Sequence, residues 1–234
     1  MNPFFTRFAF IIILCLGLLP SGIHAQNCST YYPMEVGTRL EYEIYGRNGK
    51  TEGTQWQEVT SVTETPEGEK VMMNIGFSDA REKNTYESEY GFTCTGSAIR
   101  IDYQSLLSGA MLDQYEGMEM EISGTDIELP NNLVVGQDLP DARVEMTVKM
   151  SGINMKIAVD MTNRRVEKKE SVTTPAGTFD CFVLYSESQS KMMMANTTIS
   201  SRTWLAEGVG MVQSETYNKN GKLDGRMVLT SMRR

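Results

Sequence analysis

The methionines are the residues of this sequence whose type and spacing could do chemistry. The chain has 17 of them. Methionine side chains are flexible and polarizable, and they line surfaces that accept varied apolar partners. Eight lie on segments expected to be strands, and we take them as candidate ligand-binding residues that would line a cavity for a lipid or acyl chain: Met118, Met120, Met146, Met150, Met155, Met161, Met192 and Met194. The more ordinary interpretation is a core filled with methionine.

Methionine thioethers can also bind Cu(I). The run Met192-Met193-Met194 is the strongest local signal for such a site. Successive side chains of a strand point to opposite faces, so these three sulfurs would not converge. We therefore expect no metal site, and the sequence contains no motif that implies a cofactor.

Enzymes that rely on an activated nucleophile usually need histidine, and the chain has a single one, His24. It lies within a predicted signal peptide, so the mature protein would contain no histidine and no Ser-His-Asp or Cys-His arrangement. Gly208-Val209-Gly210 lacks the later glycine and the helix start of a dinucleotide site. We expect no catalytic residues and no enzymatic activity.

Carboxylates are the remaining candidates for chemistry. Glu116, Glu119 and Glu121 lie close together, and a glycan hydrolase built on such acids is a remote alternative. Glu119 and Glu121 alternate with Met118 and Met120, which is typical of the solvated face of a strand. We expect these acids to be surface residues.

The first 25 residues are typical of a cleaved signal peptide. Arg7 supplies the positive charge, and the apolar run from Phe8 to Leu19 is shorter than the roughly 20 residues of a membrane span. Cleavage after Ala25 would leave residues 26–234 as one domain, exported to the periplasm or the exterior, soluble and without a transmembrane segment. Neither Cys15 nor Cys28 follows the small residues that lipidation requires, so we expect no lipid anchor.

The remaining chain is acidic. Removing Arg7 leaves 22 − 1 = 21 basic residues against 30 acidic ones, a net charge of −9. Nucleic acids and anionic membrane surfaces both require basic patches, so neither is an expected partner. Export also permits a disulfide among the three remaining cysteines. Spacing does not choose the pair; we favour Cys28–Cys94, which would tie down the N-terminal tail, with Cys181 as a buried thiol.

Apolar and polar residues alternate along much of the chain, which predicts antiparallel β-structure with one buried face. The clearest runs are 40–44, 144–150 and 155–161, and the last two should form a hairpin. With the turn signals Asn48-Gly49 and Asn220-Gly221, the pattern predicts about ten strands. The spacing of apolar residues from Ser105 to Tyr115 instead predicts a short amphipathic helix packed on the sheet.

Three stretches resemble a family of exported bacterial proteins named after domain of unknown function 3108, particularly its relatives from Bacteroidota. They are Val172–Phe179, Trp204–Val212 and Gly124–Asn132. The resemblance implies an open, half-closed β-barrel similar to that of the lipoprotein-localisation factors, whose concave side holds acyl chains. Fold does not determine function, so the resemblance leaves the activity open.

Two functions stay open on these grounds. The first is a non-enzymatic binding module with a lipid, a lipoprotein or another hydrophobic ligand in a methionine-rich concavity. The second is a structural or interaction protein of the bacterial cell envelope, with a filled core and an envelope protein as partner. The sequence leaves the ligand and the oligomeric state open.

Overall fold

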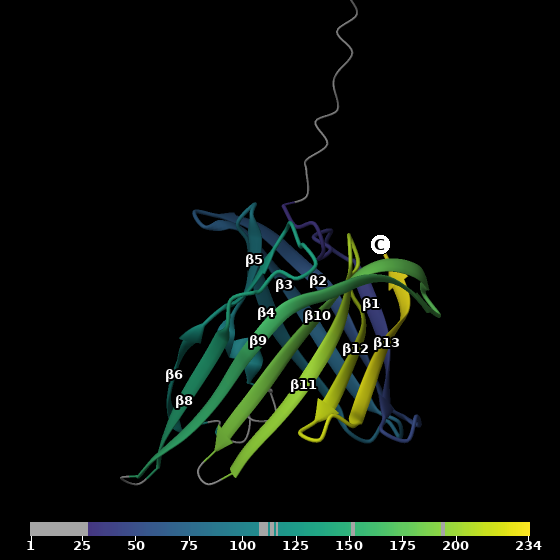
Figure 1. Ribbon diagram of the computed structural model, residues 1–234. Helices are drawn as coiled ribbons and strands as arrows, with labels where there is room; N and C mark the ends of the chain where they lie inside the picture. Colours follow the sequence, from purple (N-terminus) through teal and green to yellow (C-terminus); the bar gives the residue numbers. More distant parts are fainter. Residues whose placement is uncertain (1–27, 108–111, 113–114, 116, 151–152, 193–194) are drawn as a thin grey trace, which may run out of the picture.

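The protein is a single antiparallel sheet of thirteen strands that curls into a nearly closed barrel (Figure 1). The computed structural model describes residues 28–107, 112, 115, 117–150, 153–192 and 195–234. The strands are β1 (Arg39–Gly46), β2 (Thr51–Thr65), β3 (Gly68–Asp79), β4 (Thr85–Cys94), β5 (Ala98–Ile101), β6 (Glu119–Thr125), β7 (Ile127–Pro130), β8 (Ala142–Met150), β9 (Ile153–Thr174), β10 (Gly177–Met192), β11 (Ala195–Ala206), β12 (Gly210–Asn218) and β13 (Leu223–Arg233). The predicted signal peptide, residues 1–25, lies outside the described residues.

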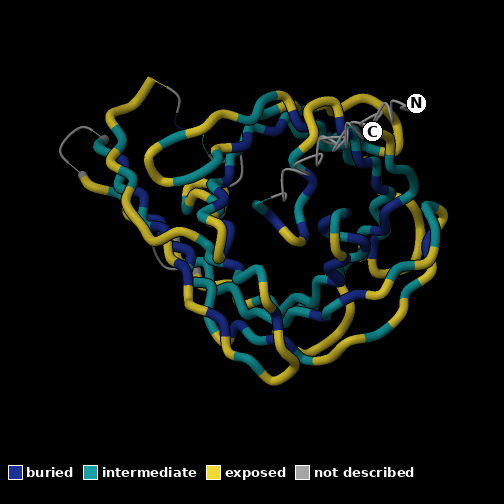
Figure 2. The backbone as a smooth tube through the Cα atoms, turned by 90° about the horizontal axis from the view of Figure 1, so that it is seen from above, coloured by how far each residue is buried: buried dark blue, intermediate teal, exposed yellow. Residues whose placement is uncertain are grey.

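The sheet begins with β6 and ends with β7, in the order β6-β8-β9-β10-β11-β12-β13-β1-β2-β3-β4-β5-β7. Only Asp126 separates β6 from β7 in the chain. One edge of the sheet therefore runs directly into the other, and the strands form a nearly complete ring when seen from above (Figure 2). No helix in the described part of the chain is long and apolar enough to cross a membrane.

The predicted hairpins are confirmed. β8 and β9 pair antiparallel, and the two strands turn between Met150 and Ile153. Gly49 and Gly221 have φ angles of 72° and 71°, as the second residue of an Asn-Gly turn requires. Local turn chemistry therefore fixes the register of these strands.

The predicted strand number was wrong, because the described chain has thirteen strands rather than about ten. β5 and β7 have four residues each, too few for an alternating pattern to be recognised.

The predicted amphipathic helix from Ser105 to Tyr115 is absent from the described elements. Where the predicted helix would begin, the structure has a 3₁₀ helix, η1 (Tyr103–Leu106). Residues 108–111 and 113–114 lie outside the described residues.

Two of the three apolar clusters formed by the described residues lie on the inner face of the barrel. The first joins β2, β3 and β4 to β9 and β11 across the ring, through residues such as Val59, Met73, Phe92, Val166 and Leu205. The second covers the inner face of β6, β8 and β9 and includes Leu107, Tyr115, Met146 and Ile157. Burying apolar side chains supplies the main stabilisation of a fold of this kind.

The N-terminal segment is held against the first cluster. A disulfide joins Cys28 to Cys94 of β4, the pair that the sequence analysis favoured. Tyr31 is 2% exposed and packs edge-on against Phe182, with ring centroids 6.2 Å apart. The Asn131 amide donates to the Cys28 carbonyl at 2.7 Å, so the segment is tied to the loop after β7 as well.

Arg164 on β9 stabilises the barrel near its seam, which is the junction between the edge strands β6 and β7. Its side chain is 6% exposed, and it donates hydrogen bonds to the main-chain carbonyls of Pro140 and Glu128, the latter at 3.0 Å. Its own carbonyl accepts from the Leu139 amide at 2.8 Å. Burial lowers the pKa of this guanidinium. The contacts link β9 to β7 and to the loop before β8.

Removing the disulfide should destabilise the fold. It closes a loop with a sequence separation of 66 residues, so Cys28→Ser should lower the free energy of unfolding by about 4 kcal/mol in the chain-entropy model. Urea denaturation under oxidising conditions measures the loss. After reduction, wild type and variant should unfold together; a loss below about 1 kcal/mol would show that the crosslink contributes little.

Two neighbouring arginines provide a matched test of the seam. Arg164→Met should lower the free energy of unfolding by about 3 kcal/mol, because two carbonyls lose a charged donor. Arg165 has a 41% exposed side chain paired with Glu167, so Arg165→Met should cost less than about 1 kcal/mol. If thermal or chemical denaturation gave the two variants equal losses of unfolding free energy, the role of Arg164 would be contradicted.

Candidate functional site

The barrel wall is incomplete beside β4. On one side β4 pairs with β3 from Thr85 to Cys94. On the other side it pairs with β5 only at Phe92, Thr93 and Cys94, because β5 is four residues long. No described strand covers this edge between Thr85 and Gly91. The sequence pattern gave no sign of this opening, since it depends on the length of β5, which is too short for an alternating pattern to be recognised.

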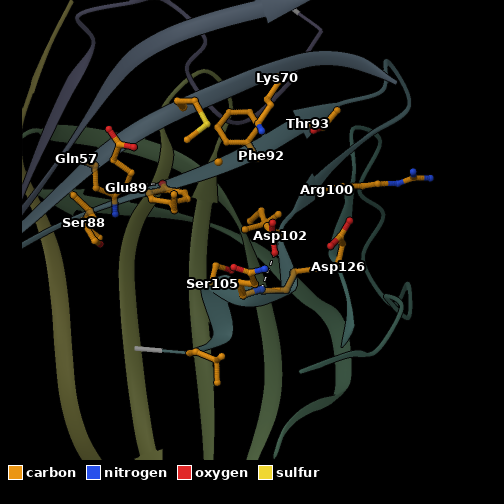
Figure 3. A pocket seen from close by; sticks show the side chains of 18 of the residues that line it. Gln57, Lys70, Ser88, Glu89, Phe92, Thr93, Arg100, Asp102, Ser105 and Asp126 are labelled. Atoms are coloured by element: carbon orange, nitrogen blue, oxygen red, sulfur yellow. Dashed lines mark hydrogen bonds between the residues drawn. The ribbon is translucent and has the colours of Figure 1, made fainter. Parts of the chain in front are cut away.

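A cavity of about 950 Å³ lies at this uncovered edge (Figure 3). Its volume is at the upper end of the range of roughly 300–1,000 Å³ typical of small-molecule sites. Much of its lining is apolar or aromatic and comes from β3, β4 and the segment that begins with η1. These side chains include Ile75, Tyr86, Tyr90, Phe92, Leu107 and Leu112.

The polar groups that face the cavity from β4 and β2 are uncharged and include Ser88, Tyr90 and Gln57. Ser88 lies on the inner face of β4, directly opposite Ile75 of β3. The Tyr90 hydroxyl lies 3.2 Å from Gln57 Oε1 and 3.2 Å from Met73 Sδ. Burial raises the pKa of the Tyr90 phenol, so it stays neutral. The interior therefore carries no charge at these positions.

The segment opposite β4 is positioned by two aspartates. Asp102 caps η1, and its carboxylate accepts from the Gln104 amide at 2.8 Å. Asp126, at the seam between β6 and β7, accepts from the Tyr103 amide at 3.2 Å. Both carboxylates line the cavity, and Figure 3 shows them beside one another at its opening.

Gly124 of β6 allows η1 to approach the sheet closely. A Cβ atom at this position would meet the Arg143 carbonyl oxygen and stand 2.8 Å from the Tyr103 ring. Tyr103 packs with the apolar cluster on β6, β8 and β9. η1 thus lies against β6 and β8 rather than against β4, which leaves the space beside β4 open.

Those of the eight predicted methionines whose side chains the structure describes do not line this cavity. Met146 is fully buried, and Met120 and Met155 pack around it in the cluster of β6, β8 and β9. Met118 is 40% exposed, and Met161 is half-buried. The side chains of Met150, Met192 and Met194 lie outside the described residues. Among the described residues, the cavity lining includes Met72, which the sequence analysis did not select.

The acids considered for hydrolysis lie on an exposed strand face. Lys149 Nζ lies 2.7 Å from Glu119 Oε1 and 2.8 Å from Glu121 Oε1. This ammonium lowers the pKa of Glu121, the opposite of what a general acid needs. Glu116 lies outside the described residues. No three His, Cys, Asp or Glu side chains within the described ranges gather as a metal site would require.

A family model described as DUF3108-like matches residues 35–229. Two solved structures share the fold. One is a protein from Bacteroides fragilis thought to be exported and to have a YmcC-like fold; it is 22% identical, with a TM-score of 0.69 over 88% of this chain and 100% of that chain. The other, from Parabacteroides distasonis and thought to be a lipoprotein, is 23% identical, with a TM-score of 0.70 over 89% and 100%. No curated protein matches the chain.

The close approach of η1 can be tested at Gly124. Gly124→Ala should lower the free energy of unfolding by about 1–3 kcal/mol, because the new methyl group pushes Tyr103 away from β6. Gly225 of β13 is the matched control: a Cβ there would meet only the Tyr45 carbonyl oxygen, at 3.5 Å. Gly225→Ala should change the free energy by less than about 0.5 kcal/mol. Similar effects of the two substitutions in urea denaturation would contradict this packing.

Proposed function

The chain belongs to the DUF3108-like family, and from that premise we propose that it is an exported binding module that holds the apolar part of an amphiphilic ligand inside its barrel. The observation that carries this proposal is the cavity beside β4. It joins an apolar interior to an opening lined with charged side chains. Ligand pockets typically combine these two kinds of surface.

The geometry supports lateral access. The uncovered edge of β4 and the start of η1 bound the opening, so a chain could pass through the wall between them (Figure 3). Ile75, Tyr90 and Leu107 would surround it. Burial of alkyl groups against such side chains stabilises a complex by roughly 0.8 kcal/mol per methylene.

We also propose that the protein is not an enzyme and acts outside the cytoplasm. The exposed, Lys149-paired positions of Glu119 and Glu121 support the first point. The signal-like N-terminus and the names of the two structural neighbours support the second. A lipid or a lipoprotein remains the expected partner class.

A cell-envelope interaction protein remains the second candidate. Its support is the outer face of the barrel, where Arg202 lies 2.6 Å from Glu167 and its guanidinium approaches the rings of Tyr185 and Tyr217. These groups satisfy one another, which favours a structural role for them. The cavity therefore supports the binding module better.

Blocking the cavity should abolish uptake of an alkyl chain. Ser88→Trp places an indole beside Ile75, and we expect it to weaken binding of a fluorescent fatty-acid analogue by about tenfold or more. Fluorescence titration of the purified mature protein measures the dissociation constant. Native mass spectrometry of protein purified from the periplasm without detergent should also find a bound amphiphile in wild type.

The control is Thr85→Trp, which changes an exposed residue on the same strand that does not line the cavity. It should bind as wild type does. If wild type takes up no probe, the binding module is wrong and the envelope protein is favoured. If Ser88→Trp folds and binds normally, the ligand does not occupy this cavity.

A further inference from the structure

The opening of the cavity carries charges of both signs. Its lining includes two basic residues, Lys70 and Arg100, and four acidic ones, Glu67, Glu89, Asp102 and Asp126. A purely anionic ligand would meet net repulsion from this set, and a purely cationic one would face the basic side chains. The arrangement of the charges therefore bears on the kind of head group that fits.

The basic residues form one row across three strands. Lys70 of β3 lies opposite Thr93 of β4, and Thr93 lies opposite Arg100 of β5. Register partners share a face of the sheet, here the outer one because the buried Phe92 next to Thr93 faces inward, so the Thr93 hydroxyl lies between the two basic side chains on the outside of the wall. Arg100 is held only loosely by Glu128, with Nε 3.7 Å from Oε2. Lysine, arginine and a hydroxyl are together typical ligands of a phosphate group.

The acidic pair, Asp102 and Asp126, lies just beyond the end of β5. Asp102 follows Arg100 by two residues, and its extended backbone (φ −51°, ψ 132°) continues the direction of β5. Two residues of a strand span about 7 Å. Asp126 precedes Ile127, the partner of Ile101, so it flanks Asp102. One oxygen of each carboxylate accepts an η1 amide, and the second oxygen of each has no part in these bonds.

We propose that the cavity binds a phospholipid with a zwitterionic head group, whose phosphate lies at Lys70, Thr93 and Arg100 and whose primary ammonium lies at Asp102 and Asp126. This assignment rests on the proposed function: the head group stays on the outer face of the wall, and the acyl chain passes the uncovered edge of β4 into the apolar cavity. Figure 3 shows Lys70 and Thr93 near one another, the two aspartates below them, and the Arg100 side chain extending away to one side.

The two halves of the head group are recognised differently. The cations and the hydroxyl donate to phosphate oxygens, an interaction that every phospholipid can make. The aspartates accept from an ammonium, which phosphatidylglycerol lacks. The acids should therefore set the preference among phospholipids, while the basic row contributes to binding of all of them.

Lysophospholipids with one common acyl chain, used below the concentration at which they form micelles, test the assignment without a membrane surface. Wild type should bind lysophosphatidylethanolamine about tenfold more tightly than lysophosphatidylglycerol, because the latter leaves the acids without a partner. Isothermal titration calorimetry of the mature protein at low and physiological salt gives both dissociation constants.

Asp102→Asn/Asp126→Asn removes both charges and keeps an oxygen for each η1 amide. It should abolish the preference between the two lipids. Glu119→Gln/Glu121→Gln removes the same charge from an exposed face outside the cavity and should keep the preference. Lys70→Gln/Arg100→Gln should weaken both lipids alike. Circular dichroism and thermal unfolding confirm that each variant is folded.

The outcomes separate the two proposals. Tight binding of both lipids without a preference, or a preference that survives the aspartate substitutions, would overturn the head-group assignment and leave the binding module intact. Failure of both lipids and of the fatty-acid probe to bind would overturn the binding module itself. If the Glu119→Gln/Glu121→Gln control lost the lipid preference to the same extent, the preference would arise from net charge and not from this site.

Discussion

The short length of β5 determines where this barrel is open. Each strand must satisfy its main-chain hydrogen bonds with neighbours on both sides or with water. β5 covers three residues of β4 and leaves the rest of that edge uncovered. The barrel is nearly closed because the two edge strands of the sheet, β6 and β7, are consecutive in the chain and joined by Asp126. The described strands thus leave a lateral gap beside β4, and the cavity lies at that gap.

The remaining contacts keep the gap in place. Arg164, the disulfide Cys28–Cys94 and Asn131 fasten the strands and the N-terminal segment at one end of the barrel. Gly124 allows η1 to lie against β6 and β8 and not across the uncovered edge. An uncovered strand edge is a liability for aggregation, and charged residues beside it are a common protection. The charged opening can therefore serve both solubility and ligand recognition.

Local signals predicted much of the fold. The alternation in residues 144–150 and 155–161 and the Asn-Gly turns specified hairpins that the structure contains. Four-residue strands have no such signal, so β5 and β7 were missed and the strand number came out low. The gap beside β4 could not be predicted, because it depends on where the four-residue β5 ends and no alternating pattern marks that point.

Local sequence signals were also insufficient to predict the candidate site. Alternation indicates which methionines share a face, but not which part of that face encloses a cavity. Met146 and Met155 face inward, where Tyr115 and Leu107 already fill the space around them. The lining of the cavity mixes Ser88 and Gln57 with tyrosines and isoleucine, a composition that resembles an ordinary strand. The charged rows at its opening come from segments that only the register brings together.

Photocrosslinking with a phospholipid that carries a diazirine near the end of its acyl chain tests the central claim most directly. Peptide mass spectrometry after irradiation maps where the chain end lies. We expect crosslinks to cavity residues, above all Ile75, Tyr90 and Leu107. Crosslinks confined to the outer face around Tyr185 and Tyr217, with none in the cavity, would contradict lateral binding beside β4.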